Sequence, residues 1–401
     1  MKVRVNHKRR LERIRQYLNE NDLKALAVFQ HYNVIYVSGL IVDVAFGERP
    51  YVAVIPADGD PYMILCELST YYSKMAIEKG LCWINDLIFY AEHPRVSKRL
   101  HTVKEWNHLF CESLSERGLK GAIGVDRMSL ATSVVTETEA LKFVDSSEFM
   151  RQIRSIKSED ELDVLRKCGE VSNIGNEKFA EVLAQGKYHH HIELEVMKAL
   201  WDNAIEKYGA DNYVKVTAII NCSGPYVLAP HGAPGNLGRK LRTGDIAITS
   251  SDVSINGYSN ENERTWFIGE PTENQVKAFT VLRKANTACI EAAVVGNRLA
   301  DIDAAAQRVI EDARYGEYIL HRTGHGKGMG DVSDGHEYPY DMPFNLEPLK
   351  PGMVLSAEPG IYIPGVGGFR FSDNIIITRR KAEQITSEKY KDLEDVIIRK
   401  S

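Results

Sequence analysis

The sequence contains no long hydrophobic run. No stretch of its 401 residues approaches the roughly 18 uninterrupted apolar residues of a membrane-spanning helix. The N-terminal segment, residues 1–21, is basic and lacks the apolar core of a secretory signal. It instead places Leu11, Ile14 and Leu18 on one face of a predicted amphipathic helix. We therefore expect a protein with no membrane partner.

Paired cysteines are also absent. The six cysteines are scattered along the chain, and none forms a CxxC pair. This usage is typical of reduced, mostly buried cysteines, so we expect the protein in the cytoplasm.

A surplus of basic residues is missing too. The chain has 50 basic and 55 acidic side chains, for a net charge of −5, so we expect no nucleic-acid partner. Low-complexity segments and short repeats are absent. What is present is an ordinary globular composition, 44% hydrophobic, at a length that favours two domains.

The pattern of the chain changes near residue 150. Residues 1–150 alternate helical and strand patterns and include a strand–turn–strand signal at 49–65, which predicts a small α/β domain with a mixed sheet. Ser158, with Glu161 three residues later, is a capping-box signature that opens a helix. We therefore place the boundary just before it and predict a second, α+β domain at 151–401, with an antiparallel sheet.

Polar residues with catalytic chemistry gather beside turns and glycines in the second domain. A glutamate inside an apolar strand is costly to bury unless it is paired or functional. In the segment 256–267, two glutamates stand two residues apart, so a strand would point both the same way. The candidates are His231, Glu261, Glu263, His325, His336, Glu337 and Glu358. By contrast, the run His189–His191 cannot share one helical face, and we interpret it as structural.

Five motifs in order carry a family likeness. They are PHGAPGNLGRKLRTGD at 230–245, GYSNENERTWFIGEP at 257–271, RTGHGKGMG at 322–330, HEYP at 336–339 and PGMVLSAEPGIY at 351–362. The chain thereby resembles the pita-bread family of creatinase, prolidase, aminopeptidase P and methionine aminopeptidase. The resemblance implies a pita-bread catalytic domain behind a smaller creatinase/prolidase-type N-terminal domain.

The resemblance also implies a set of metal-ligand positions. Metallopeptidases of this family hold two divalent metals with two aspartates, one histidine and two glutamates. In this sequence the matching positions are Ser250, Glu261, His325, Glu358 and Ser372. A serine hydroxyl is a poor substitute for a bridging carboxylate, so we expect no cofactor. The alternative is a single Mn, Co or Zn ion held by Asp252, Glu261, His325 and Glu358.

Creatinase is the member of this family that works without metal. This chain resembles creatinase in departing from the family's set of metal ligands. By that likeness, Glu263 and Glu358 hold the substrate cation while His231 acts as general acid and base. Phe46 and Arg49 of a partner subunit cover the substrate, which implies a homodimer. We take the catalytic residues as His231, Glu263, His325 and Glu358, and the substrate-binding residues as Phe46, Arg49, Glu261 and His336.

The interpretation that the sequence favours is a metal-independent hydrolase of a C–N bond. Its substrate would be a small cationic or zwitterionic molecule, either a guanidino acid or a cyclic amidine, because planar cations suit paired carboxylates. Two alternatives stay open. One is a metal-dependent Xaa-Pro dipeptidase or aminopeptidase with an altered metal site, and the other is a pita-bread protein that binds without turnover.

Overall fold

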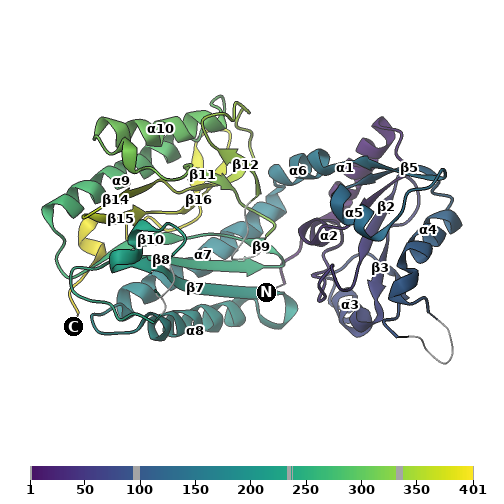
Figure 1. The fold of residues 1–401 in the computed structure, drawn as a ribbon, viewed down its shortest axis with the longest axis horizontal. Coiled ribbons are helices and arrows are strands. Elements are labelled where there is room, and N and C mark those ends of the chain that lie inside the picture. Colours follow the sequence, from purple (N-terminus) through teal and green to yellow (C-terminus); the bar gives the residue numbers. More distant parts are fainter. Residues whose placement is uncertain (1, 94–99, 233–235, 237, 331–336, 401) are drawn as a thin grey trace. The chain divides into compact units, whose positions relative to one another are not determined.

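The computed structural model describes residues 2–93, 100–232, 236, 238–330 and 337–400, and the chain divides into two compact units. One is Arg4–Arg154, and the other is Ser155–Ser401 together with Met1–Val3. Figure 1 labels many of their helices and strands.

The N-terminal unit is built on a six-stranded mixed sheet in the order β4-β3-β2-β1-β5-β6. Its strands are β1 (Ala25–Val28), β2 (Val52–Pro56), β3 (Tyr62–Cys66), β4 (Asp86–Tyr90), β5 (Gly121–Val125) and β6 (Leu141–Asp145). Its helices are α1 (His7–Glu20), α2 (His31–Ser38), α3 (Thr70–Glu78), α4 (Trp106–Glu116), α5 (Met128–Val134) and α6 (Ser147–Ser155), with 3-10 turns at Glu67–Ser69 and Val103–Glu105.

The predicted hairpin forms from β2 and β3, which pair antiparallel across the Asp58–Gly59 turn. Gly59 has a φ of 99°, a left-handed conformation that glycine adopts without strain. Both strands are buried along their whole length, as expected for a sheet covered on both faces. The predicted N-terminal helix is α1, in which Ile14 and Leu18 are buried.

Four long helices frame the C-terminal unit: α7 (Glu159–Val182), α8 (His189–Lys207), α9 (Glu273–Ala292) and α10 (Leu299–Asp312). In Figure 1 α9 and α10 lie above the strands of this unit and α8 lies below them, while α7 crosses behind β8, which it contacts. The predicted capping box opens α7, where the Ser158 hydroxyl and amide both donate to Glu161 Oε2, at 2.8 and 3.0 Å. Short 3-10 turns lie at Gly209–Asp211, Gly224–Leu228, Gly316–Tyr318 and Leu393–Val396.

The strands of the C-terminal unit form two larger sheets and a hairpin, and most neighbouring strands are antiparallel. The first sheet runs β18-β10-β8-β7 with β9 beside β8, and the second runs β12-β11-β13-β16-β17. The bounds are β7 (Val214–Ser223), β8 (Ile246–Ile255), β9 (Tyr258–Ser259), β10 (Glu263–Ile268), β11 (Gly324–Gly326), β12 (Glu337–Asp341), β13 (Val354–Ala357), β14 (Gly360–Ile363), β15 (Gly367–Arg370), β16 (Asp373–Ile377), β17 (Ala382–Gln384) and β18 (Ile397–Ile398).

Strand β8 is held against α7 by close packing. A Cβ on Gly175 of α7 would lie 1.9 Å from Ser251 Oγ, so only glycine fits at this approach. The Ser251 hydroxyl donates to the carbonyl of Ser172 on the same helix, at 2.9 Å. Because side chains alternate along a strand, Ser250 and Asp252 project from the opposite face of β8. The α/β and α+β classes predicted for the two halves are confirmed.

Candidate active site

A polar cavity of the C-terminal unit measures about 610 Å³ and opens on the face of β8 that points away from α7. Its floor is a row of cross-strand neighbours, since Ile219 of β7 pairs with Ser250 of β8, which pairs with Glu263 of β10. The lining residues are Thr217, Ile219, Asn221, Pro230, His231, Ser250, Asp252, Glu261, Glu263, His321, Arg322, Glu358 and Arg370.

Three groups of metal-ligand type converge in this cavity. His325 Nε2 lies 3.6 Å from Glu261 Oε2 and 3.4 Å from Glu358 Oε1. The three ligand atoms lie within 4.8 Å of one another. Two carboxylate oxygens and one imidazole nitrogen form a donor set that Zn, Mn and Co ions accept.

The orientation of the His325 ring fits such an ion. His325 Nδ1 lies 3.0 Å from the carbonyl oxygen of Gly326. A carbonyl oxygen only accepts hydrogen bonds, so Nδ1 carries the proton and Nε2 offers its lone pair to the cluster. The flanking glycines make this burial feasible, since a Cβ on Gly324 would lie 2.1 Å from the Ser356 carbonyl oxygen. The Gly-His-Gly motif therefore lets β11 fit between β12 and β13.

A lysine stands beside the cluster. Lys327 Nζ lies 3.5 Å from Glu261 Oε2, and the lysine side chain is 2% exposed. Burial alone would raise the pKa of Glu261, but the Lys327 ammonium and His325 hold it well below its ordinary value. Burial, followed by the negative charge of Glu261, raises the pKa of Glu358 well above its ordinary value. Without a metal ion, the two carboxyls therefore carry one proton and one negative charge.

Glu263 is engaged by an internal cation. Arg370 donates from Nε to Glu263 Oε2 at 2.5 Å and from Nη2 to Oε1 at 2.7 Å, and Asn221 donates to Oε1 at 2.7 Å. Arg370 Nη1 donates to the Pro230 carbonyl at 2.7 Å and to the Tyr362 hydroxyl at 3.3 Å. The assignment of Glu263 to a substrate cation stays a prediction. In the structure this carboxylate already has a guanidinium partner.

The two serines at ligand positions differ in their surroundings. Ser250 Oγ donates to both oxygens of Asp252 at 2.9 Å. Burial, followed by the charge of Glu261, raises the pKa of Asp252 well above its ordinary value. Ser372 is fully buried, and within the described residues its hydroxyl has no hydrogen-bond partner. Among the residues that the structure describes, the cluster brings together Glu261, His325 and Glu358 but not Asp252.

Two histidines line the cavity in different ways. His231 is exposed there. His321 Nδ1 donates to the Arg322 carbonyl at 2.8 Å, which leaves Nε2 to accept from the Tyr362 hydroxyl at 2.9 Å. Burial lowers the pKa of His321 to about 4, so its ring is neutral near pH 7.

The lining or neighbouring residues absent from the sequence predictions include four basic side chains: His321, Arg322, Lys327 and Arg370. One signal was available for Lys327, which stands two residues after His325 and so shares its strand face. The pairing of Arg370 with Glu263 spans 107 residues and has no local signal.

The remaining predicted residues lie elsewhere. Phe46 belongs to the N-terminal unit and packs edge-to-face on Tyr51, with ring centroids 5.3 Å apart. Arg49, in the same unit, pairs with Glu48 at 2.7 Å and Glu92 at 2.5 Å. His336 lies outside the described residues.

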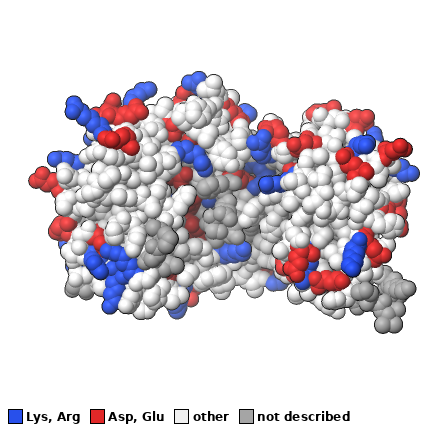
Figure 2. Space-filling model, viewed as in Figure 1, with Lys and Arg blue, Asp and Glu red and all other residues white. Residues whose placement is uncertain are grey.

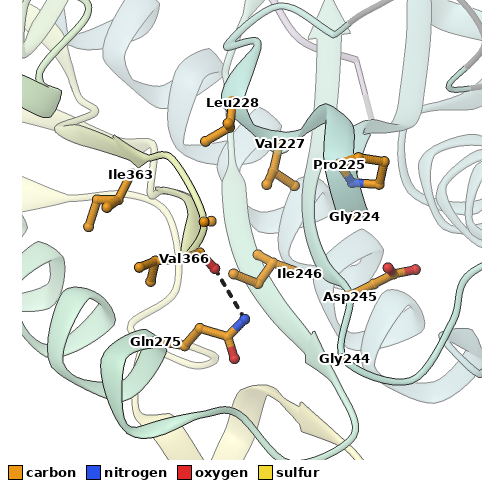
Figure 3. Close-up of a pocket in the computed structure, with 12 residues that line it drawn as sticks. Gly224, Pro225, Val227, Leu228, Gly244, Asp245, Ile246, Gln275, Ile363 and Val366 are labelled. Carbon is orange, nitrogen blue, oxygen red and sulfur yellow. Dashed lines mark hydrogen bonds between the residues drawn. The ribbon is translucent and has the colours of Figure 1, made fainter.

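A second cavity of about 250 Å³ lies beside the 3-10 turn at Gly224–Leu228 (Figure 3). Its walls are mostly apolar or glycine, and the Gln275 side chain donates to the Val366 carbonyl at 3.2 Å. Its one acidic side chain, Asp245, is paired with Arg239 at 2.6 Å. The larger cavity is therefore the candidate active site.

The surface agrees with the near balance of charge in the composition. On the face shown in Figure 2, Lys and Arg side chains are interspersed with Asp and Glu side chains. In the described parts of the chain, we find no helix with both the length and the apolar character that a bilayer span requires.

Comparisons with known proteins agree with the motifs. Residues 163–379 match the model of metallopeptidase family M24, and residues 10–156 match that of the creatinase/prolidase N-terminal domain. A Xaa-Pro dipeptidase of Pyrococcus furiosus is 26% identical over 94% of this chain and 98% of its own length. An uncharacterized peptidase of Staphylococcus aureus is 33% identical over 61% of this chain, and the match spans 66% of that protein.

Solved structures show the same fold. The dipeptidase PepE of Mycobacterium ulcerans is 27% identical, with a TM-score of 0.75 and 96% of each chain covered. A prolidase of Thermococcus sibiricus is 24% identical, with a TM-score of 0.79 over 98% of this chain and all of that one.

One expectation is corrected by these findings. The sequence interpretation that no cofactor is needed is wrong, because the chain matches a metallopeptidase family over its catalytic unit. The physical reason lies in the cluster. With serine at 250 and 372, three groups of metal-ligand type still converge, Glu261, His325 and Glu358, with their ligand atoms within 4.8 Å of one another.

Proposed function

Because this chain belongs to metallopeptidase family M24 and has the pita-bread fold of its relatives, we propose that it is a metal-dependent hydrolase that cleaves Xaa-Pro dipeptides. Hydrolysis of a C–N bond is common to this proposal and to the interpretation from sequence. The relatives favour the peptide bond over a guanidino acid, since one of them is named a Xaa-Pro dipeptidase.

The observation that carries the proposal is the three-ligand cluster in a cavity of small-molecule size. Glu261, His325 and Glu358 would hold one divalent ion. The ion, when bound, would supply Lewis-acid polarisation of the scissile carbonyl. The volume of about 610 Å³ lies within the roughly 300–1,000 Å³ usual for small-ligand sites.

We propose one ion rather than two because the chain supplies positive charge of its own. Lys327 lies beside Glu261, and Arg370 neutralises Glu263. A second ion would need two more carboxylates to balance its positive charge, and at those positions Ser250 and Ser372 contribute neutral hydroxyls.

The chain's own residues would complete the hydrolysis. Water adds its hydroxyl to the carbonyl carbon, the C–N bond breaks, and the departing prolyl nitrogen takes up a proton. We assign that proton delivery to His231, which is exposed at the cavity and can exchange with solvent. Neutral His321 holds the Tyr362 hydroxyl, which in turn accepts from Arg370, so these three groups fix one wall of the cavity.

The proposal includes three further expectations. The first is a cytoplasmic location. The second is a homodimer in which Phe46 and Arg49 of one copy cover the site of the other, and the third is a small-molecule substrate with no nucleic-acid or membrane partner.

The test combines metal analysis with a substrate panel. Chelator-treated protein, reloaded with Mn, Co or Zn, should cleave Xaa-Pro dipeptides and bind about one ion per chain. His325→Ala and Glu358→Gln should lose both the ion and the activity. Lys198→Met, on an exposed lysine of α8, is the control and should retain both. Turnover of a guanidino acid by metal-free protein, or no turnover of any dipeptide after reloading, would overturn the proposal.

A further inference from the structure

Strand β7 carries a bulge beside the cavity. Ile220 and Cys222 pair with consecutive residues of β8, so Asn221 between them is the extra residue of the bulge. Bulges are frequent next to active sites, where they re-aim a side chain. Here the Asn221 side chain lines the cavity and donates from Nδ2 to Glu263 Oε1 at 2.7 Å.

Two buried side chains from outside the sheet hold the backbone of this bulge. Asn236 donates from Nδ2 to the carbonyls of Ile220 and Asn221, at 3.1 and 3.2 Å, and its Oδ1 accepts from the Ser223 amide at 3.2 Å. Glu193 of α8 accepts from the Ile220 amide at 2.8 Å. A bulge takes backbone groups out of the strand ladder, and these side chains satisfy them.

The loop that carries His231 is anchored on both sides of this residue. Before it, the Pro230 carbonyl accepts from Arg370 Nη1 at 2.7 Å. After it, Gly232 has a φ of 81° and passes so close to the bulge that a Cβ would lie 2.7 Å from the Asn221 carbonyl oxygen. The His231 side chain is therefore exposed while the backbone on either side of it is held.

The two anchors share one carboxylate. Arg370, which holds Pro230, also donates twice to Glu263, and Asn221 donates to the same group. The contacts form a closed circuit that runs from Glu263 through the bulge to the loop of His231 and back through Arg370. In such a network the contribution of each hydrogen bond depends on the others.

We propose that Asn221 and Asn236 are positioning residues, which hold His231 where it delivers a proton to the departing prolyl nitrogen. The inference rests on the proposed function, in which His231 has that task, and gives the bulge a part in the reaction. A general acid must lie within hydrogen-bond reach of the atom that it protonates. A displacement of about 1 Å can cost roughly 100-fold in rate, so an exposed histidine on a loop depends on what anchors the loop.

The experiment is a double-mutant cycle on metal-loaded enzyme with a Xaa-Pro dipeptide. Asn236→Ala should lower kcat by about 10- to 100-fold and change KM by less than about threefold. Asn221→Ala should lower kcat in the same way. In the His231→Ala background, where the positioned group is absent, Asn236→Ala should change kcat by less than about twofold. The control is Asn297→Ala, which removes an amide that donates to one backbone carbonyl between α9 and α10 and should keep wild-type kcat.

The cycle separates this inference from the proposed function. If Asn236→Ala costs the same factor in kcat with and without His231, the asparagine is only structural and the inference fails while the proposed function stands. If His231→Ala keeps the kcat of wild type, both the assignment of proton delivery and the inference fail.

A measurement that needs no turnover complements the cycle. Asn236→Ala should speed amide hydrogen exchange in the fragment 219–232, and unchanged exchange would overturn the inference even if wild type cleaved no dipeptide and the proposed function had failed. Tm and metal content show whether each variant is folded. Should Asn236→Ala not fold, Asn221→Ala, which leaves the backbone contacts of the bulge in place, takes its position in the cycle.

Discussion

Lys327 Nζ lies 3.5 Å from Glu261 Oε2, deep in the cavity wall. A buried ammonium therefore accompanies one of the three groups that would hold a metal ion. A bound ion would compete with the lysine for the same negative charge, so we expect the metal affinity of the cluster to depend on this pair.

Lys327→Met should bind Mn or Zn more tightly than wild type. The variant lacks the ammonium that would repel the metal ion. We therefore expect Kd to fall by at least about tenfold, which corresponds to roughly 1.4 kcal/mol of binding free energy. Titration calorimetry on chelator-treated protein measures this directly. The same variant should have a lower Tm without metal, since Glu261 loses its internal partner. An unchanged Kd would show that Lys327 and the ion do not compete.

Removal of the bound ion should lower stability by mass action. At a free metal concentration of 100 times Kd, the ion contributes about 2.7 kcal/mol to the free energy of unfolding. We therefore expect a chelator to lower the Tm of wild type and to leave that of His325→Ala nearly unchanged. Equal shifts in both proteins would place the ion outside the cluster.

The Glu263–Arg370 pair should be a major source of local stability. Both side chains are at most 8% exposed, and removing one partner of such a pair costs about 3–5 kcal/mol. Arg370→Met should lower the free energy of unfolding by that amount, and Glu263→Gln combined with it should recover part of the loss. Denaturant unfolding measures both. The control is Lys198→Met, whose pair with Asp202 is exposed and should be worth at most about 1 kcal/mol.

His189 should make stability depend on pH below neutrality. Its Nε2 lies 2.8 Å from the Ser223 hydroxyl, and burial, followed by the charge of Arg239, lowers its pKa from 6.5 to about 4. The unfolded chain therefore binds more protons between these values, and the stability that is present above pH 6.5 is lost as pH falls towards 4. The loss is on the order of 3 kcal/mol.

Urea unfolding at several pH values checks this prediction. His189→Asn should flatten the slope between pH 4 and 6.5 relative to wild type. His191→Asn, two residues away and exposed, should leave the slope unchanged. A wild-type slope retained in His189→Asn would assign the effect to other groups, such as His321.

Much of the architecture could be predicted because its signals are local. The capping box at Ser158 and Glu161 is confirmed at the start of α7, and the Asn256–Gly257 turn joins β8 to β9, with φ values of 52° and 86°. The ordered motifs were sufficient to identify the family. They also place Glu261, His325 and Glu358 at matching positions, which the structure brings within 4.8 Å.

The partners of these residues could not be predicted in the same way. Arg370 reaches Glu263 from a hairpin 107 residues along the chain, and Tyr340 reaches Arg322 from a neighbouring strand. Such pairs depend on how sheets and hairpins meet in space, and no periodicity encodes that. The interpretation of Glu263 as a holder of a substrate cation considered the carboxylate without its guanidinium partner. The cofactor prediction was wrong for a related reason: Ser250 and Ser372 are evident in the sequence, whereas the convergence of Glu261, His325 and Glu358 depends on the fold.

The two faces of β8 differ in how much amino-acid substitution they tolerate. One face is fixed by the glycine of α7 that touches Ser251, where even a methyl group has no room. The other carries Ser250 and Asp252 into an open cavity. A substitution on the cavity side can exchange one cation for another, or one substrate for another, while the helix holds the strand in place. This strand therefore lets the chemistry of the cavity vary independently of the scaffold.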